Sequence, residues 1–366
     1  MEGSHEAHEG GDEVYRRAAK AIKEGTFLLV GAGAGMSADS GLPVYGDVSK
    51  LEFFQRTKLD YRDVCDPSLL IKNPERYFGW AALNISKYRA ARPHAGYDLL
   101  RRWRDDLYPA QQQQGPGTDE LVRTLHAKLR DPTSIRSLEG LGVSALPGRT
   151  FVFTTNVDGF FLRAGFHPEE VFQAHGTYER VQCAGLKREG SKSPAFKHFD
   201  GPCCQKTWEV PQDYAMEYDE LNMSAPAGAP RSSPTSVDPT HWGNHATCSH
   251  CGKLARSNIY GFGDYCFIEN EQESALFMNW CQAVQQMVKD DPKASVVLLE
   301  IGVGLRLPKV RVHFERMVKE LPEGRATIVR INPTPVDCDP ATTASVIHIY
   351  DGTLTALQKI DAMLHE

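Results

Sequence analysis

Runs of hydrophobic residues recur along this chain, each followed by small or polar residues, and they predict buried parallel strands. The first run, at 26–30 (TFLLV), follows a segment at 13–23 whose apolar residues have helical spacing. A second run, at 150–155 (TFVFTT), leads into Asn156, and a third, at 171–176 (VFQAHG), ends in a histidine and a glycine. Strands buried on both faces are typically continuous apolar runs of this kind.

The C-terminal part continues the alternation of strand and helix. Such alternation predicts an α/β fold with a doubly wound, Rossmann-like parallel sheet and a ligand crevice outside the carboxyl ends of its strands. The predicted strands are 258–264, 295–301, 326–331 and 345–350, and the predicted helices are 275–289, 310–320 and a terminal one after 353.

A long helical insertion, at about 48–149, separates the first two strands. Apolar and aromatic residues recur at helical spacing in 51–104 and again in 119–130, and we expect most of them to pack a core. The low-complexity stretch at 111–117 (QQQQGPG) predicts a loop between these helices. The polar residues 1–12 predict a disordered leader.

The loop after the first strand is rich in glycine and is a candidate nucleotide site. Gly31, Gly33 and Gly35 would let the backbone turn sharply and let a ligand approach the main chain. Bare amides between a strand and a helix suit a diphosphate, to which Ser37 could add a hydroxyl donor. The spacing departs from the Gly-x-Gly-x-x-Gly of ordinary dehydrogenases, and a structural tight turn is the alternative interpretation.

Polar side chains follow the predicted strands where such a sheet binds its ligands. Asn156 and Asp158 come directly after the second run, and His175 lies at the end of the third. An imidazole titrates near neutral pH and suits a general base, although a lone histidine can equally be structural.

Cysteines cluster in the middle of the chain and predict a metal site. Cys248 and Cys251 form a Cys-x-x-Cys-Gly knuckle, which is half of a common zinc site. Cys183, together with Cys203 or Cys204, could supply the other half, and unrelated buried thiols are the alternative. Neighbouring histidines are weaker candidates for ligands: His241, His245 and His250.

These features predict two units. Residues 181–251 would form a small zinc-binding module inserted into a nucleotide-binding domain made of 13–180 and 252–366. The basic, polar segment at about 185–201 and the segment at about 224–240, rich in Pro, Ser and Ala, predict disordered insertions in the module.

Composition narrows the class of protein. The 366 residues are 41% hydrophobic, enough for a packed core, and the formal net charge of -6 argues against a nucleic-acid partner. No apolar run approaches the ~20 residues of a membrane span, and the N-terminus lacks the basic and apolar regions of a secretory signal. Nine cysteines, an odd number, argue against a complete disulfide framework. We therefore expect an intracellular protein of the cytoplasm or the nucleus.

Four separated motifs together resemble the sirtuin family of NAD-dependent protein deacylases. The stretch at 31–43 is similar to the family's opening signature, and 154–158 is similar to Thr-Gln-Asn-Ile-Asp. His175-Gly176 resembles the catalytic His-Gly, and 248–264 resembles the second zinc pair with the Phe-Gly-Glu strand. Bacterial-type sirtuins with an expanded zinc module are the nearest in pattern, which favours Cys203 over Cys204 as a ligand. The matching zinc-module residues are Cys183, Pro202, Cys203 and Trp208.

The resemblance implies that the chain removes acyl groups from lysine side chains of proteins and releases nicotinamide and an O-acyl-ADP-ribose. It implies that His175 is the general base, that Asn156 lies by the nicotinamide ribose and the attacking water, and that Asp158 holds the carboxamide. Phe262 and Gly263 would pair with the substrate backbone as an added strand.

The resemblance also implies a co-substrate, NAD, and a structural zinc ion. The implied zinc ligands are Cys183, Cys203, Cys248 and Cys251. The implied NAD-binding residues are Gly31, Ala32, Gly33, Ala34, Ser37, Tyr45, Asn156, Asp158, Gly302, Val303, Asn332 and Thr353.

The chain departs from the family pattern near the cofactor. Val44-Tyr45-Gly46 stands where the family has Asp-Phe-Arg, and Thr155 stands where it has glutamine. Gly302-Val303-Gly304 lacks the expected Thr-Ser hydroxyls. Loss of the charged pair gives weight to an ADP-ribosyltransferase or an NAD glycohydrolase on the same fold. A non-catalytic NAD-sensing module is a further alternative.

Overall fold

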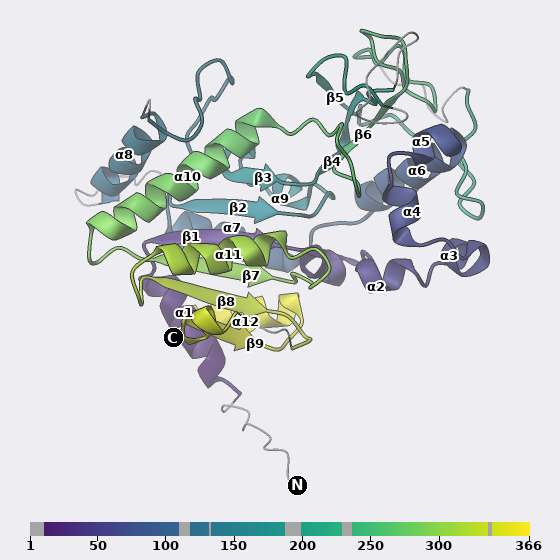
Figure 1. Ribbon diagram of the computed structural model, residues 1–366. Coiled ribbons are helices and arrows are strands. Elements are labelled where there is room, and N and C mark those ends of the chain that lie inside the picture. The colour runs from purple at the N-terminus through teal and green to yellow at the C-terminus, as the bar shows by residue number, and fades with distance from the viewer. Residues whose placement is uncertain (1–10, 110–117, 132, 187–198, 229–235, 336–338) are drawn as a thin grey trace.

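A six-stranded parallel sheet, in the order β3-β2-β1-β7-β8-β9, organises the computed structural model (Figure 1). Its strands are β1 (Phe27–Ala32), β2 (Thr150–Thr154), β3 (Val171–Gln173), β7 (Val296–Ile301), β8 (Ala326–Ile331) and β9 (Val346–Ile349). The structure describes residues 11–109, 118–131, 133–186, 199–228, 236–335 and 339–366.

The strand order confirms the predicted doubly wound, Rossmann-like sheet. The chain runs outward from β1 through β2 to β3, and then returns to the other side of β1 for β7, β8 and β9. The order therefore reverses between β1 and β7. Ligands of such sheets bind outside the carboxyl ends of the strands at this switch point.

Helices cover both faces of the large sheet, because alternate side chains of each strand point to opposite faces. Leu28 and Val30 of β1 pack into one hydrophobic core, and Phe27 and Leu29 pack into the other. The first face carries α1 (Glu13–Glu24), α7 (Ala95–Leu107), α9 (Phe160–Arg163) and α12 (Thr353–Leu364). The second carries α8 (Thr118–Leu129), α10 (Glu271–Asp290) and α11 (Lys309–Glu320).

A second, antiparallel sheet has the order β5-β4-β6. Its strands are β4 (Gly176–Cys183), β5 (Thr207–Glu209) and β6 (Ala255–Ile259). Aromatic residues of α6 (Pro74–Ala90), among them Tyr77 and Phe78, share a core with Tyr178 and Val181 of β4. This sheet and the helices packed near it form the small lobe. Its other helices are α3 (Glu52–Thr57), α4 (Tyr61–Cys65) and α5 (Leu69–Lys72).

The second sheet begins at Gly176, so β4 runs across the predicted domain boundary at 181, which stays a prediction. Two other predictions about the small lobe need correction. No strand covers 258–264: β6 ends at Ile259, and a turn follows in which Gly263 has a φ of +66°. Part of the segment predicted to be disordered is packed, since Ala225 is buried and its N–H donates to the Glu75 carbonyl at 2.9 Å.

Several other predicted segments lie outside the described residues, in whole or in large part. These are 1–10 of the leader, the loop at 111–117, 187–198 of the first insertion and 229–235 of the second. Among the helices that the structure describes, none combines the length and the apolar character that a bilayer crossing requires.

A buried ion-pair network joins β7, β8 and α11 behind the sheet's carboxyl edge. The Glu300 carboxylate accepts from Arg311 at 2.8 Å and from Arg330 at 3.1 Å, and all three side chains are at most 5% exposed. Arg311 also donates to the Val303 carbonyl at 2.9 Å, so the network holds the loop after β7.

We expect Glu300→Gln to lower the free energy of unfolding by about 3–5 kcal/mol, because it leaves two buried guanidinium groups without their shared carboxylate. Chemical denaturation would measure the change. The matched control is Glu320→Gln, at an ion pair with Arg316 whose side chains are 45% and 63% exposed; it should change the free energy by less than about 1 kcal/mol. Equal effects of the two substitutions would contradict the expectation.

Candidate active site

Ser37, Asn156 and Asp158 meet at the carboxyl ends of β1 and β2. Ser37 lies in a 3-10 helix, η1 (Ala34–Ser40), and its hydroxyl donates to Asp158 Oδ2 at 2.6 Å. Asn156 Nδ2 donates to the same hydroxyl at 3.1 Å. All three side chains are buried. Burial raises the pKa of Asp158, and the hydrogen bond from Ser37 opposes that rise.

The Ser37 hydroxyl is therefore fully engaged inside the protein. Its single hydrogen points to Asp158, and its oxygen also lies 3.0 Å from the Tyr97 hydroxyl. The predicted donation from Ser37 to a diphosphate is not available in this arrangement. Tyr97 was missed by the sequence reasoning, which counted it among the core aromatics, since nothing in its neighbours distinguishes it from them.

The glycine-rich loop packs directly against the loop that follows β7. The Gly33 N–H donates to the Ile301 carbonyl at 2.9 Å, and the Gly35 N–H donates to the Gly302 carbonyl at 3.0 Å. A Cβ at Gly33 or Gly35 would come within 2.7 or 2.6 Å of Gly302 backbone atoms. The prediction that the backbone N–H groups of this loop are free to bind a ligand is therefore wrong for Gly33 and Gly35. Glycine is needed at both positions because the two loops pack too closely for a Cβ atom.

Other residues predicted to bind NAD lie in β1 or in the segments that follow β1 and β7. Gly31 and Ala32 belong to β1 itself, and Ala34 opens η1. Gly302, with a φ of +60°, turns the chain after β7. Tyr45 begins α2 (Tyr45–Val48), and its side chain is outside the described part of the structure.

Side-chain hydrogen bonds join the loop after β8 to the loop after β7, and the segment after β9 to the segment after β1. Asn332 donates to the Val303 carbonyl at 3.2 Å, and Thr353 donates to the Gly35 carbonyl at 3.1 Å. Val303 and Thr353 are both buried. The structure thus brings Val303, Asn332 and Thr353, which the resemblance implies as NAD-binding residues, to one edge of the sheet, and the side chains of Asn332 and Thr353 are paired within the protein.

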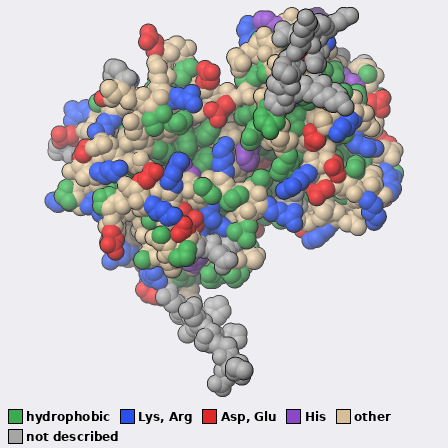
Figure 2. Space-filling view, in the orientation of Figure 1, with side chains coloured by type: hydrophobic (Ala, Val, Ile, Leu, Met, Phe, Trp, Pro, Cys, Tyr) green, Lys and Arg blue, Asp and Glu red, His purple; other side chains and the backbone are tan. Residues whose placement is uncertain are grey.

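His175 lies between β3 and β4, at the junction of the large sheet and the small lobe. Its carbonyl accepts from the Tyr260 N–H at 3.0 Å, and the N–H of the preceding residue, Ala174, donates to the Thr154 carbonyl of β2 at 2.9 Å. The Lys309 ammonium lies 3.4 Å from the neighbouring Ala174 carbonyl. Burial, and then the Lys309 charge, lower the pKa of His175 to about 4. Figure 2 shows a hollow between the large sheet with its helices and the small lobe, with hydrophobic side chains along its sides.

We expect Lys309→Ala to raise the pKa of His175, because the substitution removes a cation that disfavours the charged imidazolium. NMR titration of the imidazole, assigned with His175→Gln, would measure it. In the wild type the ring should stay neutral well below its ordinary pKa of about 6.5. Lys319→Ala, at the other end of α11, should leave the titration unchanged. A pKa that Lys309→Ala leaves in place would contradict the expectation.

Phe262 and Gly263 follow β6 in the turn near this junction. The Phe262 ring packs edge-on against Tyr61 at 6.4 Å and lies 5.2 Å from the Arg62 guanidinium. The turn therefore sits against α4. No residue of 260–264 forms a strand.

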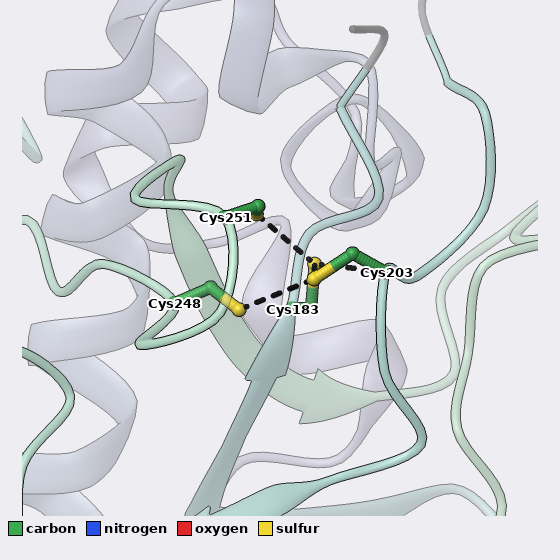
Figure 3. A group of neighbouring side chains, drawn as sticks. All are labelled: Cys183, Cys203, Cys248 and Cys251. Atoms are coloured by element: carbon green, nitrogen blue, oxygen red, sulfur yellow. Dashed lines mark hydrogen bonds between the residues drawn. The ribbon is translucent and has the colours of Figure 1, made fainter.

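Four cysteine thiols converge in the small lobe, and Figure 3 shows them directed toward one another. Cys183 ends β4, Cys203 lies in the loop that leads to β5, and Cys248 and Cys251 lie in the knuckle before β6. Their sulfur atoms all lie within 4.8 Å of one another. The structure thus brings together the four cysteines predicted as ligands, and Cys204 is not in the group.

The spacing of the thiols fits a tetrahedral ion. Sulfur atoms bound tetrahedrally to zinc at about 2.3 Å lie about 3.8 Å from each other. The Cys183–Cys203 and Cys203–Cys248 distances are 3.5 Å, and the Cys183–Cys251 distance is 3.9 Å. The four side chains can therefore hold one metal ion with little rearrangement.

The known proteins that resemble this chain are NAD-dependent protein deacylases in sequence and a Sir2 homologue in structure. No protein-family model matches the chain. An NAD-dependent protein deacylase of Thermus thermophilus is 32% identical over 191 residues, which are 52% of this chain and 57% of that protein. One of Aeropyrum pernix is 25% identical over 194 residues, 52% of this chain and 60% of that protein. A solved complex of a Sir2 homologue with NAD is similar at a TM-score of 0.52 and 19% identity, over 99% of this chain and 98% of that one.

The structural match and the sequence matches support different conclusions. The structural match shows a shared fold over almost the whole chain. The chain matches less than two thirds of the length of the curated relatives, 57% and 60%. The activity of this chain must therefore be argued from its own site.

Proposed function

We propose that this chain, a member of the sirtuin family, is an NAD-dependent protein-lysine deacylase that forms nicotinamide, an O-acyl-ADP-ribose and free lysine. One observation carries the proposal. Asn156 and Asp158 are joined through Ser37, and His175 follows Ala174, whose N–H donates to the Thr154 carbonyl, at the carboxyl edge of β1, β2 and β3. A carboxylate, a carboxamide and an imidazole at a switch point are a suitable set for a dinucleotide and a proton transfer.

The donor set fits NAD chemically. Bound NAD would supply an activated ribose carbon from which nicotinamide leaves and to which the acyl oxygen of acyl-lysine adds. Asp158, an acceptor held at both oxygens, would receive the amide hydrogens of a carboxamide. Asn156 offers both a donor and an acceptor to a ribose or a water molecule. His175 would remove a proton through a ribose hydroxyl.

Burial keeps the His175 imidazole neutral at pH 7, which is the form that accepts a proton. A pKa of about 4 makes it a weak base in the free protein. Negative charge from a bound dinucleotide would raise the pKa toward neutrality, because an anion favours the imidazolium. The base would thus gain strength when the co-substrate is in place.

We propose a structural zinc ion for the cysteine cluster. Four thiolates complete a tetrahedral shell and leave no position open for a reacting water. Such a site needs reduced thiols, which suits the cytoplasm or the nucleus as the place of action. The ion would then stabilise the small lobe, and we propose that this lobe and the NAD-binding domain form the two units of the chain.

An ADP-ribosyltransferase or an NAD glycohydrolase on the same fold is the second candidate. Val44-Tyr45-Gly46 provides no cation, and the nearby Asp47 is paired with Lys50 at 2.7 Å. The discriminating experiment measures nicotinamide release from NAD with and without an acyl-lysine peptide. Release that requires the acyl-lysine supports deacylation, and release at the same rate with an unacylated peptide favours the second candidate.

A further inference from the structure

Tyr97 of α7 is a buried tyrosine whose hydroxyl contacts Ser37 of the candidate active site. Its side chain has no exposed surface. The ring meets Phe160 and Phe161 edge to face, with centroids 5.8 and 5.0 Å away, and it also contacts His94 at 5.0 Å. These neighbours fix the ring, and with it the place of the hydroxyl, 3.0 Å from Ser37 Oγ.

The directions of the hydrogen bonds follow from counting donors and acceptors. An ionised Asp158 can only accept, so the single hydrogen of the Ser37 hydroxyl goes to Asp158 Oδ2, at 2.6 Å. Asn156 Nδ2 is a donor and gives one hydrogen to Ser37 Oγ, at 3.1 Å. The Ser37 oxygen therefore accepts from Tyr97, whose hydroxyl is the donor. Burial raises the pKa of Tyr97 far above its usual range, so this donor keeps its hydrogen.

Ser37 alone would not hold this arrangement. A serine hydroxyl can rotate, and its hydrogen could leave Asp158 for another acceptor. A donor from Tyr97 and one from Asn156 occupy both lone pairs of the oxygen, so the remaining hydrogen must point toward Asp158. The second Asp158 oxygen, Oδ1, accepts from the Phe160 N–H at 2.9 Å. Both oxygens of the Asp158 carboxylate are thereby held by hydrogen bonds.

We propose that Tyr97 is a positioning residue that acts through Ser37 to orient Asp158 and Asn156 toward the nicotinamide end of NAD. The proposal rests on the proposed function, because it assumes that Asp158 and Asn156 face that end. It predicts a selective effect. Loss of the Tyr97 hydroxyl should weaken the binding of ligands that carry nicotinamide more than the binding of ligands that lack it.

Calorimetric titration of Tyr97→Phe with NAD and with ADP-ribose tests this, because ADP-ribose lacks the nicotinamide. Phenylalanine keeps the ring and removes only the hydroxyl. We expect NAD to bind about tenfold more weakly, the effect of roughly one hydrogen bond. ADP-ribose should be weakened less than NAD, because it keeps the ribose beside Asn156 but lacks the carboxamide that Asp158 would hold. Tyr108→Phe is the matched control: Tyr108 is equally buried and donates to the Ile22 carbonyl, far from the site.

Thermal melting of both variants shows whether the fold is retained, and Ser37→Ala removes a second hydroxyl from the same chain of bonds. Ser37→Ala should weaken NAD binding at least as much as Tyr97→Phe and again affect ADP-ribose less. Equal weakening of both ligands, or unchanged NAD binding in Tyr97→Phe and Ser37→Ala, would overturn the proposal. A wild type that binds neither ligand would instead overturn the proposed function.

Discussion

Replacing His175 with alanine is expected to slow the formation of O-acyl-ADP-ribose by about a hundredfold or more while the protein stays folded. The side chain lies at the junction of the large sheet and the small lobe, where the Thr155 backbone and Lys309 surround it. Among the side chains proposed to touch the reactants it is the one suited to take a proton at pH 7, because burial keeps its imidazole neutral. Loss of a positioned general base lowers a rate by about 10²- to 10⁴-fold.

Steady-state kinetics with NAD and an acetyl-lysine peptide would measure this loss. His126→Ala is a suitable control, because His126 also bonds a backbone carbonyl, that of Pro147, but lies on α8 away from the site. The control should keep its activity. A His175→Ala variant that turns over at the wild-type rate would show that the base has been assigned wrongly.

Replacing Cys203 with alanine is expected to release the metal and to unfold the small lobe. Three thiols would remain in a site built for four, and the sheet β5-β4-β6 depends on loops tied by the cluster. Structural zinc contributes about 10–16 kcal/mol of apparent binding free energy in small zinc-finger peptides, so its loss is a large effect. Metal analysis of the purified protein, together with thermal melting, would show both changes.

The neighbouring cysteine provides the control. Cys204 is adjacent in sequence but is not a member of the thiol cluster. Cys204→Ala should therefore retain one zinc ion per chain and melt at nearly the wild-type temperature. Metal loss in Cys204→Ala with retention in Cys203→Ala would reverse the assignment.

Hydrophobic patterning was sufficient to predict the large sheet. Runs such as 295–301 and 326–331 are continuous because their strands are buried on both faces, and β7 and β8 lie there. The same pattern failed at 258–264. There the apolar and aromatic residues belong to a strand end and a turn closed by Gly263, and a short segment gives periodicity too few residues to separate the two.

The site was only partly predictable. Asn156, Asp158 and His175 were predicted as site residues because polar residues directly follow apolar strands, and their roles stay a prediction. The cysteine cluster was found because a Cys-x-x-Cys knuckle has a characteristic spacing. Tyr97 and Lys309 could not be found this way. Each reaches the site across a large sequence separation, from helices whose docking on the sheet is decided by tertiary packing.

The occupied amides of the glycine loop illustrate the same limit. Glycines after a strand predict a close backbone approach, but they do not say what approaches. Here the partner of Gly33 and Gly35 is the loop after β7, a protein segment more than two hundred residues further along the chain.

Mass spectrometry of the products formed from NAD and an acetyl-lysine peptide by the zinc-loaded protein tests the proposed activity most directly. We expect O-acetyl-ADP-ribose, nicotinamide and deacetylated peptide in equal amounts, and none of them without the acyl group. Plain ADP-ribose released without the peptide, or ADP-ribose attached to protein with the acetyl group intact, would contradict deacylation and identify the second candidate instead.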